Sequence, residues 1–364
     1  MENLGLKKYQ HLFFGLTIAV VALYYTMHSV SFSEVALAFK MMDYKYIIPA
    51  LLIMIITYVF RAYRWQALLE STCKVSVWGL YSPMMVGYLG NFLPARAAEI
   101  FRPYLLSKKY DLPFSTAFAS IVMERLFDLI MLMLIFVWVF WFEAGVFSSE
   151  IKFSGISVQT MAIKFGQICL TAIGALMVFI YLLLRHKEKV MLSVQWFTHR
   201  LPEKWGGKIN SLVEEFSVGC EVTRNFGTLT KITIYSVLVW MGSIVSLYPL
   251  YFAFDLQNKT AASVLILSVM TRILITIAPT PGFLGSYNAG VFIALHEIMN
   301  ESEAKVVSFG LVGWALCGIV VLVGGFYFTL HEHMSIRSLM EIEKHRDTTL
   351  DRESADTKTT QSLS

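Results

Sequence analysis

Long apolar runs separated by short polar segments dominate the pattern of this 364-residue chain. A helix needs about 20 mainly apolar residues, with a range of roughly 17–25, to cross the hydrocarbon core of a bilayer. Six runs reach that length, so the pattern predicts an all-α membrane protein with about six spanning helices. These runs lie at about residues 11–28, 46–64, 114–142, 164–184, 230–253 and 305–330.

Two further apolar stretches, at 77–104 and 261–299, are interrupted by glycine and proline. Proline removes a backbone donor and clashes with the preceding turn, and glycine lowers helix propensity. We therefore expect each stretch to form two half-helices that enter the membrane and turn back. The turns should face protein or water, because lipid cannot satisfy the freed backbone groups. The alternative is that the breaks are packing kinks in ordinary spanning helices.

Composition agrees with a membrane protein, because 56% of the residues are hydrophobic and only 15% are charged. An ordinary soluble protein carries roughly 25% charged residues, so a pair of soluble domains is excluded. The net charge of +4 is too weak a bias to suggest nucleic acid as a partner. The four cysteines form no C-x-x-C pair, and we expect no disulfide framework, metal site or cofactor.

Lysine and arginine are unevenly distributed between the loops. They are frequent at 61–109 and 185–224, whereas the loops at 143–163 and 255–260 carry one lysine each. The positive-inside rule therefore places both termini in the cytoplasm. With this topology the order span, span, broken hairpin, span occurs twice in opposite orientations. Such an inverted repeat is typical of transporters, with the site near the bilayer midplane between the broken helices.

The chain is expected to contain one membrane domain, at residues 1–330, and a polar, disordered cytoplasmic tail at 331–364. Within the membrane domain, the segment at about 186–226 shows apolar residues at a three-four spacing. This spacing predicts two helices on the inner membrane surface, or alternatively a soluble helical hairpin packed on the membrane domain.

Two clusters of charged residues lie inside or beside the apolar segments. In the first, Arg96, Glu99 and Arg102 are spaced three apart, so a helix that restarts after Pro94 would carry them on one face. The second cluster lies within the third predicted span and consists of Glu124, Arg125 and Asp128.

A charged side chain at the bilayer centre costs at least about 2.5–3.5 kcal/mol. The second cluster should therefore face inward and be paired, with the face at 96–102 and with Arg272 of the second broken stretch as partners. One positive charge would remain when the four arginines are set against the three acids, namely Arg96, Arg102, Arg125 and Arg272 against Glu99, Glu124 and Asp128. That excess favours an anionic ligand, and the arginine fork suits phosphate. The alternative is that these ion pairs are structural.

The turns of the broken stretches complete the expected site. Pro281, Gly282 and Gly285 permit a tight turn before a half-helix, whose N-terminus would offer a modest anion site. Arg61 and Arg64, at the cytoplasmic end of the second span, are expected to extend to the membrane surface instead.

Three motifs carry a family resemblance. In chain order they are Gly90-x-x-x-x-Pro94 with Arg96, Glu99 and Arg102, then Glu124-Arg125-x-x-Asp128, then Pro281-Gly282-x-x-Gly285. Over about residues 10–330 the chain resembles the flippase-like transmembrane domain of lysylphosphatidylglycerol synthases. It departs from that family at Phe283, where a glycine is common, and at Asn288, where an acid is common.

The resemblance implies a bacterial or archaeal cytoplasmic-membrane protein that moves a lipid or a lipid-linked headgroup between leaflets. Its partners would be an anionic phospholipid or a polyprenyl-phosphate-linked glycan, and a separately encoded lipid synthase or glycosyltransferase. A second copy of the same chain, which would give a homodimer, is a further candidate partner. The synthase's catalytic domain has no counterpart in this sequence, so no aminoacyl transfer is expected.

The residues expected to bind substrate are Asn91, Arg96, Glu99, Arg102, Glu124, Arg125, Asp128, Arg272, Pro281, Gly282 and Gly285. Glu99, Glu124 and Asp128 would hold the arginines in place and relay a proton. Two rival functions remain open. One is a membrane enzyme acting on a lipid phosphate or sugar donor, and the other is a scaffold for envelope synthesis.

Overall fold

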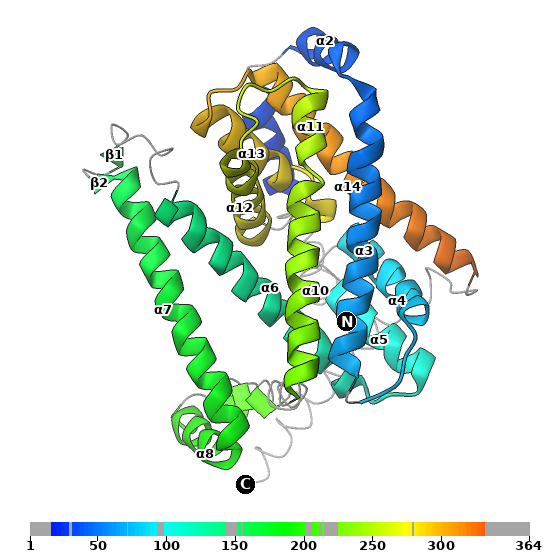
Figure 1. Cartoon of the computed structure of the whole chain (residues 1–364), viewed down its shortest axis with the longest axis vertical. Helices are drawn as coiled ribbons and strands as arrows, with labels where there is room; N and C mark the ends of the chain where they lie inside the picture. The colour runs from blue at the N-terminus through cyan, green and yellow to red at the C-terminus, as the bar shows by residue number, and fades with distance from the viewer. Residues whose placement is uncertain are drawn as a thin grey trace, which may run out of the picture.

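The computed structural model describes most of the membrane domain and is built of helices (Figure 1). Within the described part of the chain, the strands are β1 (Lys152–Phe153) and β2 (Ile156–Ser157), which pair antiparallel. The other described elements are helices or helical turns, so the predicted all-helical class is confirmed. The described residues are 16–28, 31–70, 72–92, 98–142, 152–153, 156–200, 206–207, 209–210, 213–214, 225–278 and 280–331.

Three described segments are long and apolar enough to cross a membrane, namely Tyr44–Leu69, Phe226–Ala253 and Glu303–His331. They contain α3 (Ile47–Leu69), α10 (Phe226–Val245) with α11 (Tyr248–Ala253), and α14 (Glu303–His331). The helix Leu16–Met27 and α2 (Phe32–Met41), bent by 76°, would together make a fourth. The predicted number of six spans is thus only partly supported.

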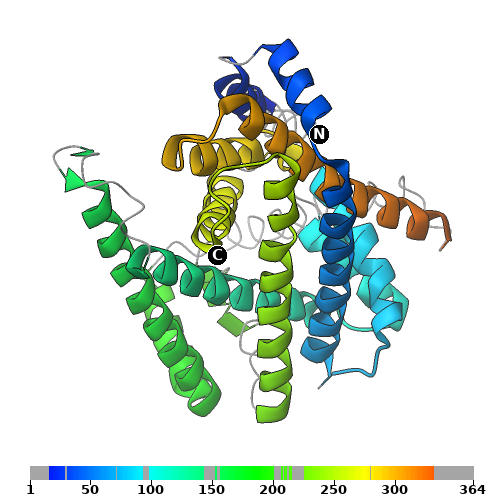
Figure 2. The same ribbon diagram turned by 45° about the horizontal axis from the view of Figure 1, so that its top comes forward.

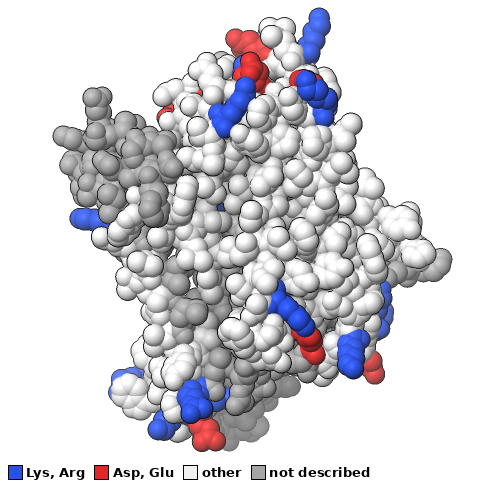
Figure 3. Space-filling model, in the orientation of Figure 1, with Lys and Arg blue, Asp and Glu red and all other residues white. Residues whose placement is uncertain are grey.

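Two more helices have the length of a span. Helix α6 (Phe114–Phe142) has 29 residues and the bounds expected from the sequence, and α7 (Val158–Arg185) has 28. At about 1.5 Å per residue, each is longer than the roughly 30 Å hydrocarbon core. On the face drawn in Figure 3, most charged side chains gather toward the two ends, and the described surface between them is largely uncharged. This is the surface expected of a protein embedded in a bilayer.

Both broken stretches form two helices, with a short 3₁₀ turn described between them. In the first stretch, α4 (Val77–Leu89) and the turn η2 (Gly90–Phe92) precede α5 (Ala98–Tyr110), and α4 packs against α5. In the second, α12 (Ala261–Ile277) precedes the turn η6 and a helix that packs back on it. The elements after α12 are η6 (Pro281–Phe283), α13 (Ser286–Phe292) and the π-helical turn η7 (Ile293–Ile298).

The two breaks meet inside the molecule, because η2 packs against η6. Gly282 has φ of 59°, and a Cβ added there would lie 2.8 Å from the ring of Phe92. Gly285 has φ of 89°, and its Cβ would lie 2.7 Å from the carbonyl oxygen of Ala19. Glycine is therefore required at both positions by backbone conformation and by close packing.

Three helix contacts frame the space around these breaks. Helices α3 and α10 run side by side (Figure 1 and Figure 2), α5 packs on α6, and α6 packs on α12. On the opposite side α14 contacts both α4 and α13. Segments far apart in the chain thereby surround one interior volume.

The predicted surface helices are described only in part. Helix α8 (Lys187–Thr198) forms after α7, and its Leu192, Trp196 and Phe197 side chains are exposed. Most of 201–224 and the whole tail after His331 lie outside the described residues. The division of the chain into one membrane domain at 1–330 and a polar tail at 331–364 therefore stays a prediction.

Candidate functional site

A cavity of about 520 Å³ lies beside the two breaks, and residues of α3, α4, α5, α6, α10, α12, α13 and α14 form the rest of its wall. Asn91 and Phe92 of η2 and Gly282 of η6 line it. Small-molecule sites usually have volumes of about 300–1,000 Å³, so the space is adequate for a headgroup-sized ligand. Four arginines also line the cavity, namely Arg61, Arg102, Arg125 and Arg272.

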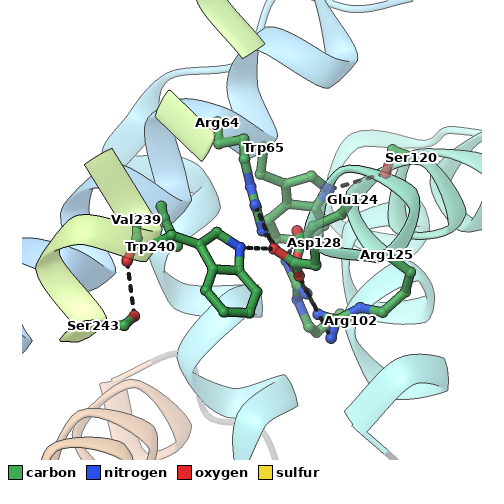
Figure 4. Close-up of polar contacts among 10 residues, drawn as sticks. All are labelled: Arg64, Trp65, Arg102, Ser120, Glu124, Arg125, Asp128, Val239, Trp240 and Ser243. Atoms are coloured by element: carbon green, nitrogen blue, oxygen red, sulfur yellow. Dashed lines mark hydrogen bonds and ion pairs between the residues drawn. The ribbon is translucent and has the colours of Figure 1, made fainter. Parts of the chain in front are cut away.

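The carboxylate of Glu124 lies behind the cavity wall and is fully buried. Arg102 of α5 donates to both of its oxygens, from Nη1 to Oε1 at 2.9 Å and from Nη2 to Oε2 at 2.8 Å (Figure 4). Arg125 donates to Oε1 at 2.9 Å, and Arg64 lies 3.4 Å from the same oxygen. Three cations thus compensate one buried acid, which gives Glu124 the pairing that a buried carboxylate requires.

Asp128 lies one helical turn beyond Glu124 on the same face of α6. Its Oδ1 accepts from Nη1 of Arg64 at 2.7 Å and from the indole N–H of Trp240 at 3.2 Å. Nη1 of Arg125 lies 3.7 Å from the other oxygen. This aspartate therefore joins three helices, because Arg64 belongs to α3 and Trp240 to α10.

Aromatic contacts hold the buried arginines in position. The guanidinium of Arg102 lies over the rings of Trp65 and Tyr88, 4.5 and 4.9 Å from their centroids. The indole N–H of Trp65 donates to the Ser120 hydroxyl of α6 at 2.9 Å. Arginine stacked on an aromatic face is restrained as well as stabilised, so Arg102 is fixed from several sides.

Arg61 and Arg272 differ from the other arginines of the cavity. Within the described part of the chain, no carboxylate lies at ion-pair distance from either guanidinium. Arg61 lies over Tyr58 at 5.7 Å from the ring centroid, and Arg272 lies over Trp240 at 5.5 Å. Neither guanidinium is therefore neutralised by an adjacent carboxylate, and both contribute positive charge to the cavity.

The balance of charge around the cavity is clearly positive. Arg61, Arg64, Arg102, Arg125 and Arg272 oppose Glu124 and Asp128, so five cations against two anions leave three positive charges among the described residues. Low-dielectric walls strengthen the field of such an excess. The arrangement can therefore hold an anion in the interior of an otherwise apolar molecule.

The residues expected from the sequence have different locations. Asn91, Arg102, Arg125, Asp128, Arg272 and Gly282 line the cavity, and Glu124 supports it from behind. Pro281 and Gly285 shape the turn next to the cavity without lining it. Arg96 and the side chain of Glu99 lie outside the described residues.

The half-helix after the second break is less suited to bind an anion than the sequence suggested. Helix α13 has only 7 residues, and its first side chains are used internally. Asn288 accepts the backbone N–H of Gly285 at 3.2 Å, and the hydroxyls of Ser286 and Thr280 are hydrogen-bonded at 2.9 Å. These groups stabilise the turn.

Phe283 occupies the position where the family resemblance leads us to expect glycine. Its φ of 62° is in the left-handed region, which costs a residue with a Cβ roughly 1–2 kcal/mol. The residue also lines the cavity. This sequence therefore accepts backbone strain where a bulky side chain narrows the site.

The expectation that Arg64 extends to the membrane surface is wrong. Its side chain is fully buried and forms an ion pair with Asp128. A charge-assisted hydrogen bond to a carboxylate of α6 stabilises the guanidinium more than contact with the membrane surface would. Arg61 lines the cavity one turn earlier on α3. The i, i+3 spacing of the two arginines was the signal available in the sequence. Sequence reasoning also missed Tyr88, Trp240 and Tyr287, since aromatic residues are common throughout such chains.

The comparisons with known proteins agree with this architecture. The family described as the lysylphosphatidylglycerol synthase TM region matches residues 12–342. The chain is 24% identical over 277 residues to a UPF0104 membrane protein of Methanothermobacter thermautotrophicus, covering 72% of this chain and 77% of that protein. No solved structure matches it.

A second relative carries a functional name. The chain is 21% identical over 347 residues to the glycosyltransferase AglD of Haloferax volcanii, covering 90% of this chain. It spans 55% of that protein, about half of its length. Because the family match extends over nearly the whole sequence, this multi-pass membrane protein belongs to the family of the lysylphosphatidylglycerol synthase transmembrane region.

Proposed function

We propose that the protein moves an anionic lipid, or a lipid-linked headgroup, between the leaflets of the membrane. The observation that carries this proposal is the cavity of about 520 Å³ whose arginines outnumber its carboxylates. Uncompensated charge deep in a membrane protein is costly, and it persists where a ligand of opposite charge binds. The cavity would hold the headgroup while the acyl chains remain in the surrounding lipid.

The seam between α6 and α12 supports a lateral path for those chains. Leu129 of α6 lines the cavity and is 43% exposed, and the exposed Thr276 of α12 lines it from the other side. An apolar chain could therefore leave the cavity toward lipid while the charged group stays inside. This geometry favours a lipid over a soluble anion as the substrate.

The arrangement of the breaks supports alternating access. Two pairs of half-helices meet at their breaks beside the cavity, as is usual in transporters built from inverted repeats. In our proposal the two halves of the chain form such a repeat, with both termini in the cytoplasm and the protein in the cytoplasmic membrane. Rocking of one half against the other would expose the cavity to each leaflet in turn.

A second candidate function is a role in the synthesis of lipid-linked glycans. The name of the relative AglD favours it, since that protein is called a glycosyltransferase. In this version the present chain would supply the membrane-embedded part, and a separate glycosyltransferase or lipid synthase would act on the lipid. Purification of a stoichiometric enzyme partner together with the chain would support this version.

The test of translocation uses proteoliposomes that contain a fluorescent anionic lipid. Dithionite bleaches only label in the outer leaflet, so further bleaching reports movement across the membrane. We expect the wild type to expose the inner label and Arg125→Gln to lose most of this activity. Arg200→Gln is the control, because it removes the same charge from an exposed residue that does not line the cavity. Wild-type rates in Arg125→Gln, or no lipid movement by the wild type, would refute the proposal.

A further inference from the structure

Arg61 and Arg272 lie near each other on opposite walls of the cavity. They belong to α3 and α12, and the charge of Arg61 acts unfavourably on Arg272. Asp128 attracts both guanidinium groups, but from beyond ion-pair distance. Their stacking partners Tyr58 and Trp240 supply an aromatic face and no negative charge. Two cations on one cavity, neither with a carboxylate at ion-pair distance among the described residues, indicate a ligand that compensates both.

Two buried hydroxyl groups point to the same ligand. Tyr88 and Tyr287 line the cavity and are each only 8% exposed. Among the described residues, neither hydroxyl has a hydrogen-bond partner. A buried hydroxyl without a partner is costly, so its presence beside a cavity suggests a bond to something that enters the cavity.

These hydroxyls lie beside the two arginines. Tyr88 is close enough to Arg61 to interact with it electrostatically, and Tyr287 is close enough to Arg272 to do the same. Tyr88 comes directly before the first break and Tyr287 directly after the second. Each break thus contributes one hydroxyl donor next to one guanidinium.

We infer that Arg61, Arg272, Tyr88 and Tyr287 form a binding site for a phosphoryl group with two negative charges, as on a phosphate monoester or a pyrophosphate. The inference rests on the proposed function, since it names the substrate class for the same cavity. A phosphate monoester carries about 1.5–2 negative charges at neutral pH, whereas a phosphodiester carries one. A phosphodiester would leave one of the two arginines without a counter-charge.

Binding of matched ligands to purified protein in detergent tests this assignment. The probes are dioctanoyl phosphatidic acid, a monoester, and dioctanoyl phosphatidylglycerol, a diester with the same acyl chains. Quenching of tryptophan fluorescence reports binding, because Trp240 and Trp314 line the cavity. We expect the monoester to bind at least about tenfold more tightly, in proportion to a second charge-assisted contact. Equal affinity for the two lipids would overturn the assignment of charge.

Inorganic pyrophosphate distinguishes the source of the phosphoryl group. Binding of phosphatidic acid without binding of pyrophosphate assigns the site to a lipid headgroup. Binding of both, lost together in the same variants, assigns it to the phosphoryl group whether free or attached to lipid. Failure of both probes to bind would overturn the inference.

Arginine variants test the residues. Arg61→Gln and Arg272→Gln should each weaken binding of phosphatidic acid by about tenfold or more, while Arg200→Gln leaves it unchanged. Arg272→Lys keeps the charge but not the planar fork, and should retain part of the affinity. Without ligand, neither glutamine variant should unfold at a lower temperature than the wild type, because each removes an unpaired charge. Wild-type affinity in both glutamine variants would refute the site.

The tyrosines give a test that a structural role would fail. Tyr88→Phe and Tyr287→Phe remove only hydroxyls that have no protein partner, so the ligand-free variants should be at least as stable as the wild type. Binding of phosphatidic acid should nevertheless weaken by about threefold to tenfold in each. Reduced stability with unchanged binding would mean that the hydroxyls serve the fold instead.

The same variants separate this inference from the proposed function. If phosphatidic acid binds as expected but moves between leaflets no faster than in protein-free liposomes, translocation is wrong and the site stands. If Arg61→Gln and Arg272→Gln move lipid at the wild-type rate, the site is wrong and translocation stands.

Discussion

Arg102 and Glu124 form a two-pronged ion pair in the interior of the molecule, with N–O distances of 2.9 and 2.8 Å. The pair connects α5, the second half of the first broken stretch, to α6. Neither side chain has more than 2% of its surface exposed. The contact fixes the break that borders the cavity, so Glu124 supports the site without lining it.

Glu124→Gln should destabilise the protein strongly. Removal of one partner from a buried ion pair typically costs about 3–5 kcal/mol, and here Arg102, Arg64 and Arg125 would lose their shared anion. A large drop in the thermal unfolding midpoint in detergent is the expected result. The control is Glu70→Gln, which breaks the exposed pair with Lys231 and should cost at most about 1 kcal/mol. Equal midpoints for the two variants would contradict this interpretation.

Trp240→Phe should lower stability modestly while keeping most anion binding. The change removes the indole N–H that donates to Asp128, a bond worth roughly 0.5–1.5 kcal/mol. It leaves an aromatic ring for Arg272 to stack on, although a weaker one than indole. Fluorescence titration through Trp314, together with a thermal unfolding curve, measures both effects. Complete loss of binding would show that Trp240 does more than orient its neighbours.

Gly282→Ala should disrupt the second break. The residue has φ of 59°, and the added methyl would meet the ring of Phe92 at 2.8 Å. Backbone strain alone costs about 1–2 kcal/mol, and the two breaks would be pushed apart. We expect a lower unfolding midpoint and slower lipid movement. Gly174→Ala on the exposed side of α7 is the matched control, because a Cβ there meets no atom within 4 Å and should be neutral or slightly stabilising.

The Glu70–Lys231 pair should make a small contribution to stability that depends on pH. A hydrogen bond from Lys231, followed by its charge, lowers the pKa of Glu70 below the ordinary value of 4.5. A carboxyl whose pKa is lowered in the folded state contributes stability above its unfolded pKa and loses that contribution as the pH falls through the folded pKa. The free energy of unfolding of the wild type and of Lys231→Gln should be measured from neutral pH into acid. The two proteins should differ in stability at neutral pH, and the difference should vanish in acid. A difference that persists in acid would mean that Lys231 acts in another way.

Local pattern was sufficient to predict the helical class and the two broken stretches. The bounds of α6 agree with the sequence expectation because a long apolar run has few ways to satisfy its backbone in lipid. The breaks at Gly90 and Gly282 were also predictable from local sequence, because glycine and proline disfavour helix at the positions where they occur. The need of Glu124 for a buried cation also followed from its position in an apolar run.

The identity of the partners could not be read from the sequence. Arg64 was expected at the membrane surface, yet it bonds to Asp128, 64 positions away in the chain. Arg272 was expected to pair with the acids, yet it stacks on Trp240 and faces the cavity. Each guanidinium had several acids or surfaces within reach of its helix, and only the packing of α3, α10 and α12 selects among them.

The pattern of residues is enough to conclude that this chain is helical, lies in a membrane and carries charges where lipid would exclude them. These properties depend on the transfer of each segment from water to hydrocarbon, which is a local property. Helix packing selects the cations that are neutralised and those that are left facing the cavity. That outcome depends on distances between helices that are remote in the chain, and so on how their surfaces fit together.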